Sequence, residues 1–224
     1  MKIGIITPME EEKREILSSM QIEKETKIGG QTYTEGVLSN QNIVLTESGI
    51  GKVMSSIATT MLIREFGVDL IINTGSAGAL DEQLNIGDVV IGTTLGYHDA
   101  DNTAFGYELG QMPQQPLFFE SDAKYEEIFE DIVPDAKKGL IVSGDSFVSG
   151  DKKQLIEKNF PQALAVEMES ASIAQTAYNF DTPLVVIRSI SDKADGTADV
   201  TFDDFVVTAG VESAKVLKEF LNRV

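Results

Sequence analysis

The chain has no cysteine and only one histidine, His98, among its 224 residues. The lack of cysteine excludes disulfide bonds, thiolate catalysis and zinc sites that use cysteine ligands. With a single histidine, a metal site would have to be built from carboxylates. We therefore expect chemistry that depends on carboxyl and hydroxyl groups and uses no metal.

Basic residues are also few, with 18 Lys and Arg against 36 Asp and Glu and a formal net charge of −18. Such a chain repels polyanions, so nucleic acids are not expected partners. The apolar stretch near the N-terminus is short, because Ile3 to Ile6 is followed by Thr7, Pro8 and acidic residues. A signal peptide or a membrane span needs a longer apolar segment. We expect a cytoplasmic protein with no membrane partner.

Short β-branched segments alternate along the chain with segments of helical periodicity, and no repeat or Pro/Gly/Ser-rich linker divides them. This alternation predicts an α/β fold with a mostly parallel sheet. Because 42% of the residues are hydrophobic, the chain can bury one sizeable core, and residues 1–224 are interpreted as a single domain. The predicted strands are Lys2–Thr7, Asn42–Glu47, Leu70–Asn73, Val89–Thr93, Leu140–Ser143, Ala163–Val166 and Leu184–Ile190.

Two segments have the clearest helical periodicity. The first ends before Gly67, and its apolar stripe is Ile50, Val53, Met54, Ile57, Ala58, Met61 and Leu62. The second is the C-terminal helix, whose apolar face is Phe205, Val206, Ala209, Leu217, Phe220 and Leu221. Helices of this length between strands predict a mixed sheet that is covered on both faces.

The segment Tyr97–Phe119 fits neither pattern, because it has no sustained period and contains two prolines and five aromatic residues. Irregular segments of this length in compact domains are often functional. We interpret it either as a surface loop packed on its own aromatic residues or as a lid or subunit interface.

Acidic and small residues follow five of the predicted strands. In open α/β sheets, ligands bind beyond the carboxyl ends of the strands, which would gather these segments around one cleft. Each acid taken alone is also explained by the preference for acids and small polar residues at helix N-termini. Several carboxylates in one cleft raise one another's pKa, which favours a functional reason. The segments are Pro8–Glu12, Thr74–Gly78, Gly144–Phe147, Glu167–Ser170 and Ser191–Lys193.

Two other catalytic patterns are incomplete. Gly49–Lys52 resembles part of a phosphate-binding loop, but Thr46 and Val53 stand where the Walker pattern requires glycine and Ser or Thr. The same stretch lacks the third glycine of the dinucleotide-binding fingerprint, so we expect no nucleotide cofactor. A Ser76–His98 dyad would lack the motif that surrounds a nucleophilic serine.

Taken together, these segments resemble the bacterial 5′-methylthioadenosine/S-adenosylhomocysteine nucleosidases of the nucleoside phosphorylase and hydrolase superfamily. The resemblance implies a nucleoside phosphorylase-like fold, no cofactor, and hydrolysis of the N-glycosidic bond of adenine thio-nucleosides and of 5′-deoxyadenosine. The matching motifs follow the family's order over almost the whole chain: Met9–Glu12, Ser48–Val53, Ile71–Gly78, Tyr97–Asp101, Thr103–Tyr107, Val166–Glu169 and Arg188–Asp192.

The resemblance also implies catalytic roles. Cleavage of the C1′–N9 bond passes through an oxocarbenium-like state, and the purine leaves more easily when N7 is protonated. Asp192 is implied as the general acid at N7, and Glu12 as the base that activates water. Ser76 and Arg188 are implied to position that water, and Glu169 to accept hydrogen bonds from the ribose hydroxyls.

Further residues are implied to bind the rest of the substrate. Phe147 would stack on adenine, and the backbone of Val148 would bind its edge. The other implied substrate-binding residues, several of which would form an apolar pocket for the 5′-alkylthio group, are Met9, Ile50, Gly78, Met168, Ser191 and Phe202. A homodimer is implied because the same pocket would receive four residues of a second chain, Asn102, Phe105, Tyr107 and Pro113.

Two positions depart from the family pattern. Asn102 stands where relatives have an aliphatic residue, which leaves the preference among 5′ substituents open. Ser170 follows the implied ribose-binding glutamate where Ala or Gly is expected, and we expect this small change to be harmless.

The nearest alternative is a purine nucleoside phosphorylase or another adenine nucleosidase of the same superfamily. Phosphorylases have Arg at the position of Asn73, whereas this chain has Asn there and three glutamates after Met9, which repel phosphate. Futalosine and AMP nucleosidases need a basic pocket for an acidic 5′ group, which the implied apolar pocket does not supply. A nucleoside-binding protein without activity is disfavoured because all three implied carboxylates are present.

Overall fold

The computed structural model describes residues 1–195 and 198–224, but not the side chains of residues 198–204 and 206. In this described part of the chain, ten strands form one mixed sheet with helices on both faces, which confirms the predicted α/β fold class. The strands are β1 (Lys2–Thr7), β2 (Gln21–Ile28), β3 (Gln31–Leu38), β4 (Gln41–Glu47), β5 (Leu70–Ala79), β6 (Val89–Tyr97), β7 (Phe119–Glu120), β8 (Lys137–Ser143), β9 (Ala163–Glu167) and β10 (Leu184–Asp192).

The strand pairings close half of this sheet into a ring. β5 pairs with β10, β10 with β6, β6 with β8, β8 with β9, and β9 pairs again with β5. The other half extends from β5 through β1, β4, β3 and β2. Parallel pairs join β1 to β4 and β5, β5 to β10, and β8 to β6 and β9, whereas the remaining pairs are antiparallel. The ring brings the carboxyl ends of β5, β8, β9 and β10 to one mouth, beside the end of β1.

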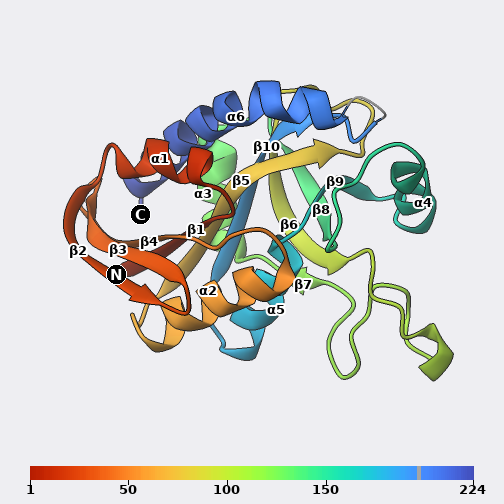
Figure 1. Ribbon diagram of the computed structural model, residues 1–224, viewed down its shortest axis with the longest axis horizontal. Coiled ribbons are helices and arrows are strands. Elements are labelled where there is room, and N and C mark those ends of the chain that lie inside the picture. Colours follow the sequence, from red (N-terminus) through yellow and green to blue (C-terminus); the bar gives the residue numbers. More distant parts are fainter. Residues whose placement is uncertain (196–197) are drawn as a thin grey trace.

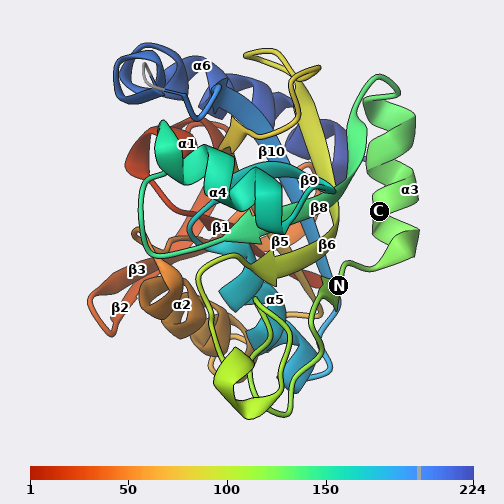
Figure 2. The same ribbon diagram turned by 90° about the vertical axis from the view of Figure 1, so that its right-hand side faces the viewer.

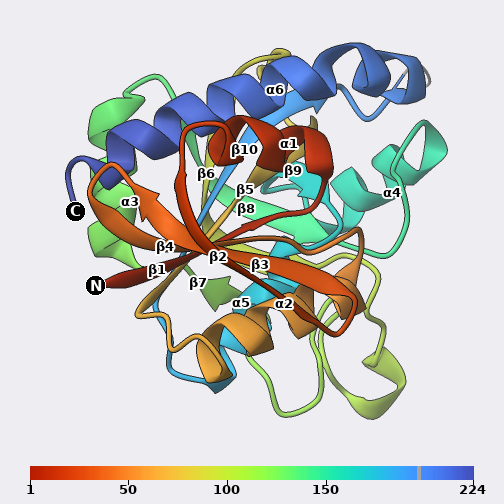
Figure 3. The same ribbon diagram turned by 60° about the vertical axis from the view of Figure 1, so that its left-hand side comes forward.

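Two helical layers enclose the sheet (Figure 1). The helices α1 (Glu10–Leu17), α3 (Ala123–Ile132) and α6 (Ala198–Leu221) cover one face, and Figure 3 shows α6 running along α1 on this side. The helices α2 (Lys52–Arg64) and α5 (Ser170–Asn179) pack together on the other face. The remaining α-helix of the described part, α4 (Asp151–Asn159), lies at the right-hand edge of the molecule in Figure 1 and faces the viewer in Figure 2. None of the described helices has the length and apolar character needed to span a bilayer.

The structure corrects the predicted stripe of α2. The buried face of this helix consists of Ser55, Ala58, Thr59 and Leu62, whereas Val53 is 70% exposed and Ile50 and Met54 are also exposed. The prediction holds for Ala58 and Leu62 but was wrong for Ile50, Val53 and Met54, because an apolar stripe shows only that residues share a face, and the buried face near the N-terminus of α2 carries Ser55 and Thr59. In α6, Ala209 and Leu217 are buried as predicted, and Phe205 is exposed. The side chain of Val206 lies outside the described residues.

The structure also corrects several strand limits. β5 continues to Ala79, so that Thr74–Gly78 is buried strand and not the predicted turn. β6 continues to Tyr97 and β10 to Asp192. The hairpin of β2 and β3 was not predicted, because β2 is exposed along most of its length and has no apolar alternation. Its turn at Gly29-Gly30, where both φ angles are positive, was the available signal.

The irregular segment is confirmed between the end of β6 and the start of β7, where the described structure is a short 3₁₀ turn at Thr103–Phe105 and loops. Phe105, at the tip of this segment, is 82% exposed. Packing on its own aromatic residues therefore does not describe this part of the segment.

Candidate active site

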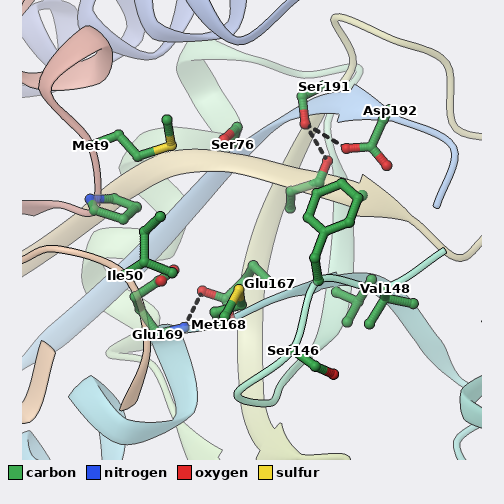
Figure 4. A pocket seen from close by; sticks show the side chains of 15 residues that line it. Met9, Ile50, Ser76, Ser146, Val148, Glu167, Met168, Glu169, Ser191 and Asp192 are labelled. Carbon is green, nitrogen blue, oxygen red and sulfur yellow. Dashed lines mark hydrogen bonds between the residues drawn. The ribbon is translucent and has the colours of Figure 1, made fainter. Parts of the chain in front are cut away.

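A cavity opens at the mouth of the strand ring, where the segments that follow β1, β5, β8, β9 and β10 meet. Together with the open solvent at its mouth, the space free of protein atoms is about 680 Å³. All five strand ends that the sequence marked as acidic or small contribute to its wall, as predicted. The lining residues are Pro8, Met9, Ile50, Ser76, Ala77, Gly78, Ser146, Phe147, Val148, Val166, Glu167, Met168, Glu169, Ser191 and Asp192 (Figure 4).

Glu12 lies behind this wall, buried in the first turn of α1. Its Oε1 accepts hydrogen bonds from the backbone N–H and the hydroxyl of Ser76, both at 2.8 Å. Its Oε2 accepts a 3.2 Å bond from the Met9 N–H, which is half of a capping box and holds the carboxylate at the helix start. Burial raises the pKa of Glu12, against the opposing effects of the Arg188 charge and of these hydrogen bonds. The carboxyl is therefore fixed in place and able to take up a proton.

Arg188 is fully buried on β10 and is paired with Glu167. Its Nη2 donates to Glu167 Oε2 at 2.5 Å and to Asn73 Oδ1 at 2.7 Å. Its Nη1 donates to the Ser76 carbonyl at 3.3 Å, next to Glu12. A Cβ at Gly75 would lie 2.6 Å from Nη1 and 3.0 Å from Glu12 Oε1, so glycine at this position permits the close approach of these two charged groups.

Glu167 organises the start of α5 as well as Arg188. Its Oε2 also accepts bonds from the backbone N–H groups of Glu169 and Ser170, and its Oε1 accepts from Ser143 Oγ. The Ser170 hydroxyl contacts Glu167, Asn73 and Arg188 at 2.8–2.9 Å. Ser170 is thus part of the buried network that orients Arg188, which its small size alone did not suggest.

Glu169 is buried at the N-terminus of α5, and its Oε1 accepts a 2.9 Å bond from the Gly51 N–H (Figure 4 shows its position beside Ile50 and Met168). Its Oε2 is 3.8 Å from Arg188 Nη2. Burial, with the neighbouring Glu167 charge, raises the pKa of Glu169 to about 8. Glu169 thus lines the cavity with one hydrogen bond from the Gly51 N–H and a more distant contact to Arg188. Its carboxyl oxygens have remaining capacity to accept hydrogen bonds from a ligand.

Asp192 ends β10 on another wall of the cavity. Its Oδ1 accepts from the Ala194 N–H at 2.8 Å, and its Oδ2 accepts from the Ser191 hydroxyl at 2.9 Å (Figure 4). Burial raises its pKa, although these two hydrogen bonds lower it. A Cβ at Gly78 would lie 3.0 Å from Asp192 Oδ1, a tight contact that the carboxyl would have to relieve by shifting.

The structure brings most of the candidate residues together. Ten of them line the cavity: Met9, Ile50, Ser76, Gly78, Phe147, Val148, Met168, Glu169, Ser191 and Asp192. Glu12 and Arg188 contact this wall from behind. The side chain of Phe202 lies outside the described residues.

The four residues expected from a partner chain do not line the cavity of their own chain: Asn102, Phe105, Tyr107 and Pro113. Asn102 donates a 2.9 Å bond from its side-chain nitrogen to the Gln111 carbonyl, which braces its own loop. Sequence reasoning gave no role to Glu167, Asn73 or Ser143. The available signal for Glu167 was its place in an acid pair at a strand end, two residues before Glu169.

The chain belongs to the phosphorylase superfamily, whose sequence profile matches residues 2–222. A 5′-methylthioadenosine/S-adenosylhomocysteine nucleosidase of Staphylococcus aureus is 47% identical over 227 residues, which cover 99% of this chain and all of that protein. The Streptococcus pneumoniae MTA/SAH nucleosidase in complex with 8-aminoadenine is 48% identical, with a TM-score of 0.97 over the full length of both chains. The futalosine hydrolase of Helicobacter pylori is 37% identical, with a TM-score of 0.95 over 100% of this chain and 98% of that chain.

The chain belongs to the 5′-methylthioadenosine/S-adenosylhomocysteine nucleosidase family, an N-glycosyl hydrolase family.

Proposed function

We propose that this protein hydrolyses the N-glycosidic bond of 5′-methylthioadenosine and S-adenosylhomocysteine, and also that of 5′-deoxyadenosine, releasing adenine. One observation carries the proposal: buried carboxyl groups from three different elements lie at one cavity, with Glu169 and Asp192 on its wall and Glu12 directly behind Ser76 of that wall. Each has a raised pKa caused by burial. Groups perturbed in this way within one cavity are expected where protons are transferred.

Asp192 is proposed as the general acid. Because burial raises its pKa, the carboxyl retains a proton that it can give to purine N7 as the C1′–N9 bond breaks. The Ser191 hydroxyl and the Ala194 N–H then stabilise the carboxylate that remains. The purine leaves as a neutral base, which avoids the cost of an anionic leaving group.

Glu12 is proposed as the general base. A water molecule held near Ser76 and Arg188 would lose a proton to Glu12 as its oxygen forms the new bond to C1′. The two bonds from Ser76 fix Oε1, and Arg188 attracts the negative charge that develops on the water oxygen. The oxocarbenium-like sugar is also stabilised by the nearby carboxylates.

The remaining contacts are proposed from the cavity wall. Glu169 would accept hydrogen bonds from the 2′ and 3′ hydroxyls of ribose, for which its position and free acceptor capacity are suited. Phe147 lines the cavity, and its ring would stack on adenine. The apolar side chains of Met9, Ile50 and Met168 would bury the 5′-alkylthio group.

Water is favoured over phosphate as the nucleophile. No described residue that lines the cavity is Lys or Arg. Arg188, which lies behind the wall, is already paired with Glu167 and bonded to Asn73. A phosphate would therefore find no free cation among the described lining residues to offset its own charge.

A homodimer is proposed to complete the cavity. Ile50 lines the cavity but is exposed, and Val53 and Phe105 are among the most exposed apolar side chains of the described part. Large apolar side chains exposed to this extent are accounted for when a second chain covers them. We propose that Asn102, Phe105, Tyr107 and Pro113 of one chain close the 5′ side of the partner's cavity.

The experiment is a comparison of free-base release from five substrates by the purified protein, with adenine as the product of four of them and hypoxanthine as the product of futalosine. Methylthioadenosine, S-adenosylhomocysteine and 5′-deoxyadenosine should be cleaved, and AMP should not, because the wall has no cation for a 5′-phosphate. Futalosine also carries an acidic 5′ group, and its rate should be far below that of methylthioadenosine. A protein that cleaves futalosine faster than methylthioadenosine, or that cleaves neither, would refute the proposed substrate class.

A further inference from the structure

The loop between β8 and α4 carries Phe147 and Val148 into the cavity. Val148 is buried in a hydrophobic cluster, and the start of the loop is held by contacts with other elements. Its first residue, Gly144, is pinned between two neighbours. The Gly144 N–H donates to the Glu167 carbonyl at 3.2 Å, and a Cβ at this position would lie 2.3 Å from His98 Nε2. The loop begins so close to the imidazole ring of His98 that only glycine is tolerated there.

The next residue, Asp145, is held by the side chain of Asp99. Asp99 Oδ2 accepts a 2.9 Å hydrogen bond from the Asp145 N–H and a second 2.9 Å bond from Lys52 Nζ. Asp99 Oδ1 accepts a 2.8 Å bond from the same ammonium group. Asp99 stands two residues after β6, so its carboxylate joins the irregular segment after β6 to the loop after β8 and to helix α2. Figures 1 and 2 show α2 and the irregular segment on the same side of the sheet.

The same contacts continue to the start of α2. Asp145 Oδ1 accepts a 2.9 Å bond from the Lys52 N–H, and its Oδ2 is 3.4 Å from Lys52 Nζ. The preceding residue, Gly51, has a φ of 94°, and a Cβ there would lie 3.1 Å from Asp145 Oδ1. The Gly51 N–H is the donor that holds Glu169 Oε1. A chain of contacts thus runs from the loop of Phe147 through Asp99 and Lys52 to Gly51, which holds Glu169, the residue proposed to bind ribose.

We propose that Asp99 is a positioning residue, whose carboxylate holds the loop of Phe147 and Val148 in the geometry that binds the purine. This inference rests on the proposed function, because it takes that loop to be the purine contact. The Lys52 hydrogen bonds and the Asp145 N–H outweigh the effect of burial and keep the pKa of Asp99 below its ordinary value. Asp99 is therefore ionised at neutral pH, and its hydrogen bonds are charge-assisted.

Asp99→Asn tests the proposal, because it keeps one acceptor but replaces the other oxygen by an NH₂ group that faces the Lys52 ammonium. Asp81→Asn is the matched control. Asp81 accepts 2.7 Å and 2.8 Å bonds from Lys137 Nζ and from the Gln83 N–H, and its side chain is 26% exposed against 30% for Asp99. Neither Asp81 nor Lys137 lines the cavity.

The readout is the dissociation constant of adenine, measured by calorimetry, together with KM and kcat for methylthioadenosine. D99N should weaken adenine binding by about tenfold, the usual worth of a partly exposed charge-assisted contact, and should raise KM more than it lowers kcat. D81N should leave the adenine dissociation constant and the KM within about twofold of their normal values. Both variants should lower Tm to a similar extent. Lys52→Gln, which removes the cation and keeps Asp99, should weaken adenine binding in the same direction and provides the test if D99N does not fold.

The outcomes separate the two proposals. If the unaltered protein neither binds adenine nor cleaves methylthioadenosine, the proposed function fails. If it does both and D99N binds adenine as tightly as D81N does, Asp99 only stabilises the fold and the inference is overturned. A loss confined to kcat in D99N would also overturn it, because a misplaced purine loop must weaken purine binding.

Discussion

Glu12→Gln separates the proposed chemistry of the catalytic base from its structural role. The amide matches the carboxylate in size, and its oxygen can still accept both bonds from Ser76. Its nitrogen, however, replaces Oε2 and faces the Met9 N–H, so the hydrogen bond from Met9 is lost.

The two effects differ in magnitude. Loss of the single bond from Met9 costs about 0.5–1.5 kcal/mol of unfolding free energy, which corresponds to roughly 2–6 °C in Tm for a chain of this size. The neutral amide also removes the cost of burying a charge, which offsets part of that loss. Removal of a general base, in contrast, lowers turnover by about 10²–10⁴, or roughly 3–5 kcal/mol in the activation barrier. Catalysis should therefore collapse in a protein that remains folded.

The assay is steady-state release of adenine from methylthioadenosine across pH, with thermal unfolding of the same preparations. In the unaltered protein, the rate should fall as pH decreases through the raised pKa of Glu12, because the base must be ionised. E12Q should lack this acidic limb. Glu10→Gln, at the exposed first position of the same helix, is the control and should retain both rate and profile. An E12Q protein with more than about a tenth of the normal kcat would refute the assignment.

Three further substitutions test the other assignments. The Asp192→Asn variant should bind methylthioadenosine within about threefold of normal but turn it over about 10²–10⁴ times more slowly. Because burial raises the pKa of Asp192, the rate of the unaltered protein should fall as pH rises through that pKa. A fall in rate at alkaline pH that persists in D192N would contradict the assignment. Glu169→Ala should impair methylthioadenosine about tenfold more than its 2′-deoxy analogue, which already lacks one hydrogen-bond partner, whereas equal losses would leave Glu169 as a helix-terminal acid only. Phe105→Ala should raise KM for methylthioadenosine about fivefold more than for adenosine, as expected for one buried methylthio group, and activity per chain should fall on dilution below the dimer dissociation constant; a fully active monomer would remove Phe105 from the site.

The sequence predicts the layer order of the fold better than the limits of its elements. Buried parallel strands such as β1 and β8 have continuous β-branched runs that leave little ambiguity. β5 is different, because small residues from Thr74 to Gly78 have the composition of a turn. These residues remain in the strand because β10 pairs along them in parallel. Gly75 and Gly78 have no side chains, and Arg188 and Asp192 occupy the space beside them.

The candidate site follows the same division. The carboxyl-end rule for α/β sheets correctly gathers five acidic or small segments around one cavity, although β8 and β9 run opposite to β5 and β10 in the ring. The network around Arg188 could not be found in this way, because Asn73 and Ser143 are ordinary strand residues until the ring of strands brings them together with Glu167. The contacts of a second chain remain a prediction for a similar reason: residues that serve a partner's cavity leave only an exposed surface on their own chain.

The central claim is that carboxylates of this chain direct water, and not phosphate, to C1′. The most direct measurement is the product of methylthioadenosine cleavage, identified by mass spectrometry after reaction in phosphate-free buffer and in buffer with added phosphate. We expect adenine and free methylthioribose at the same rate in both buffers, because the cavity offers no free cation for phosphate among its described lining residues. A rate that depends on phosphate, with methylthioribose 1-phosphate as the product, would contradict the account.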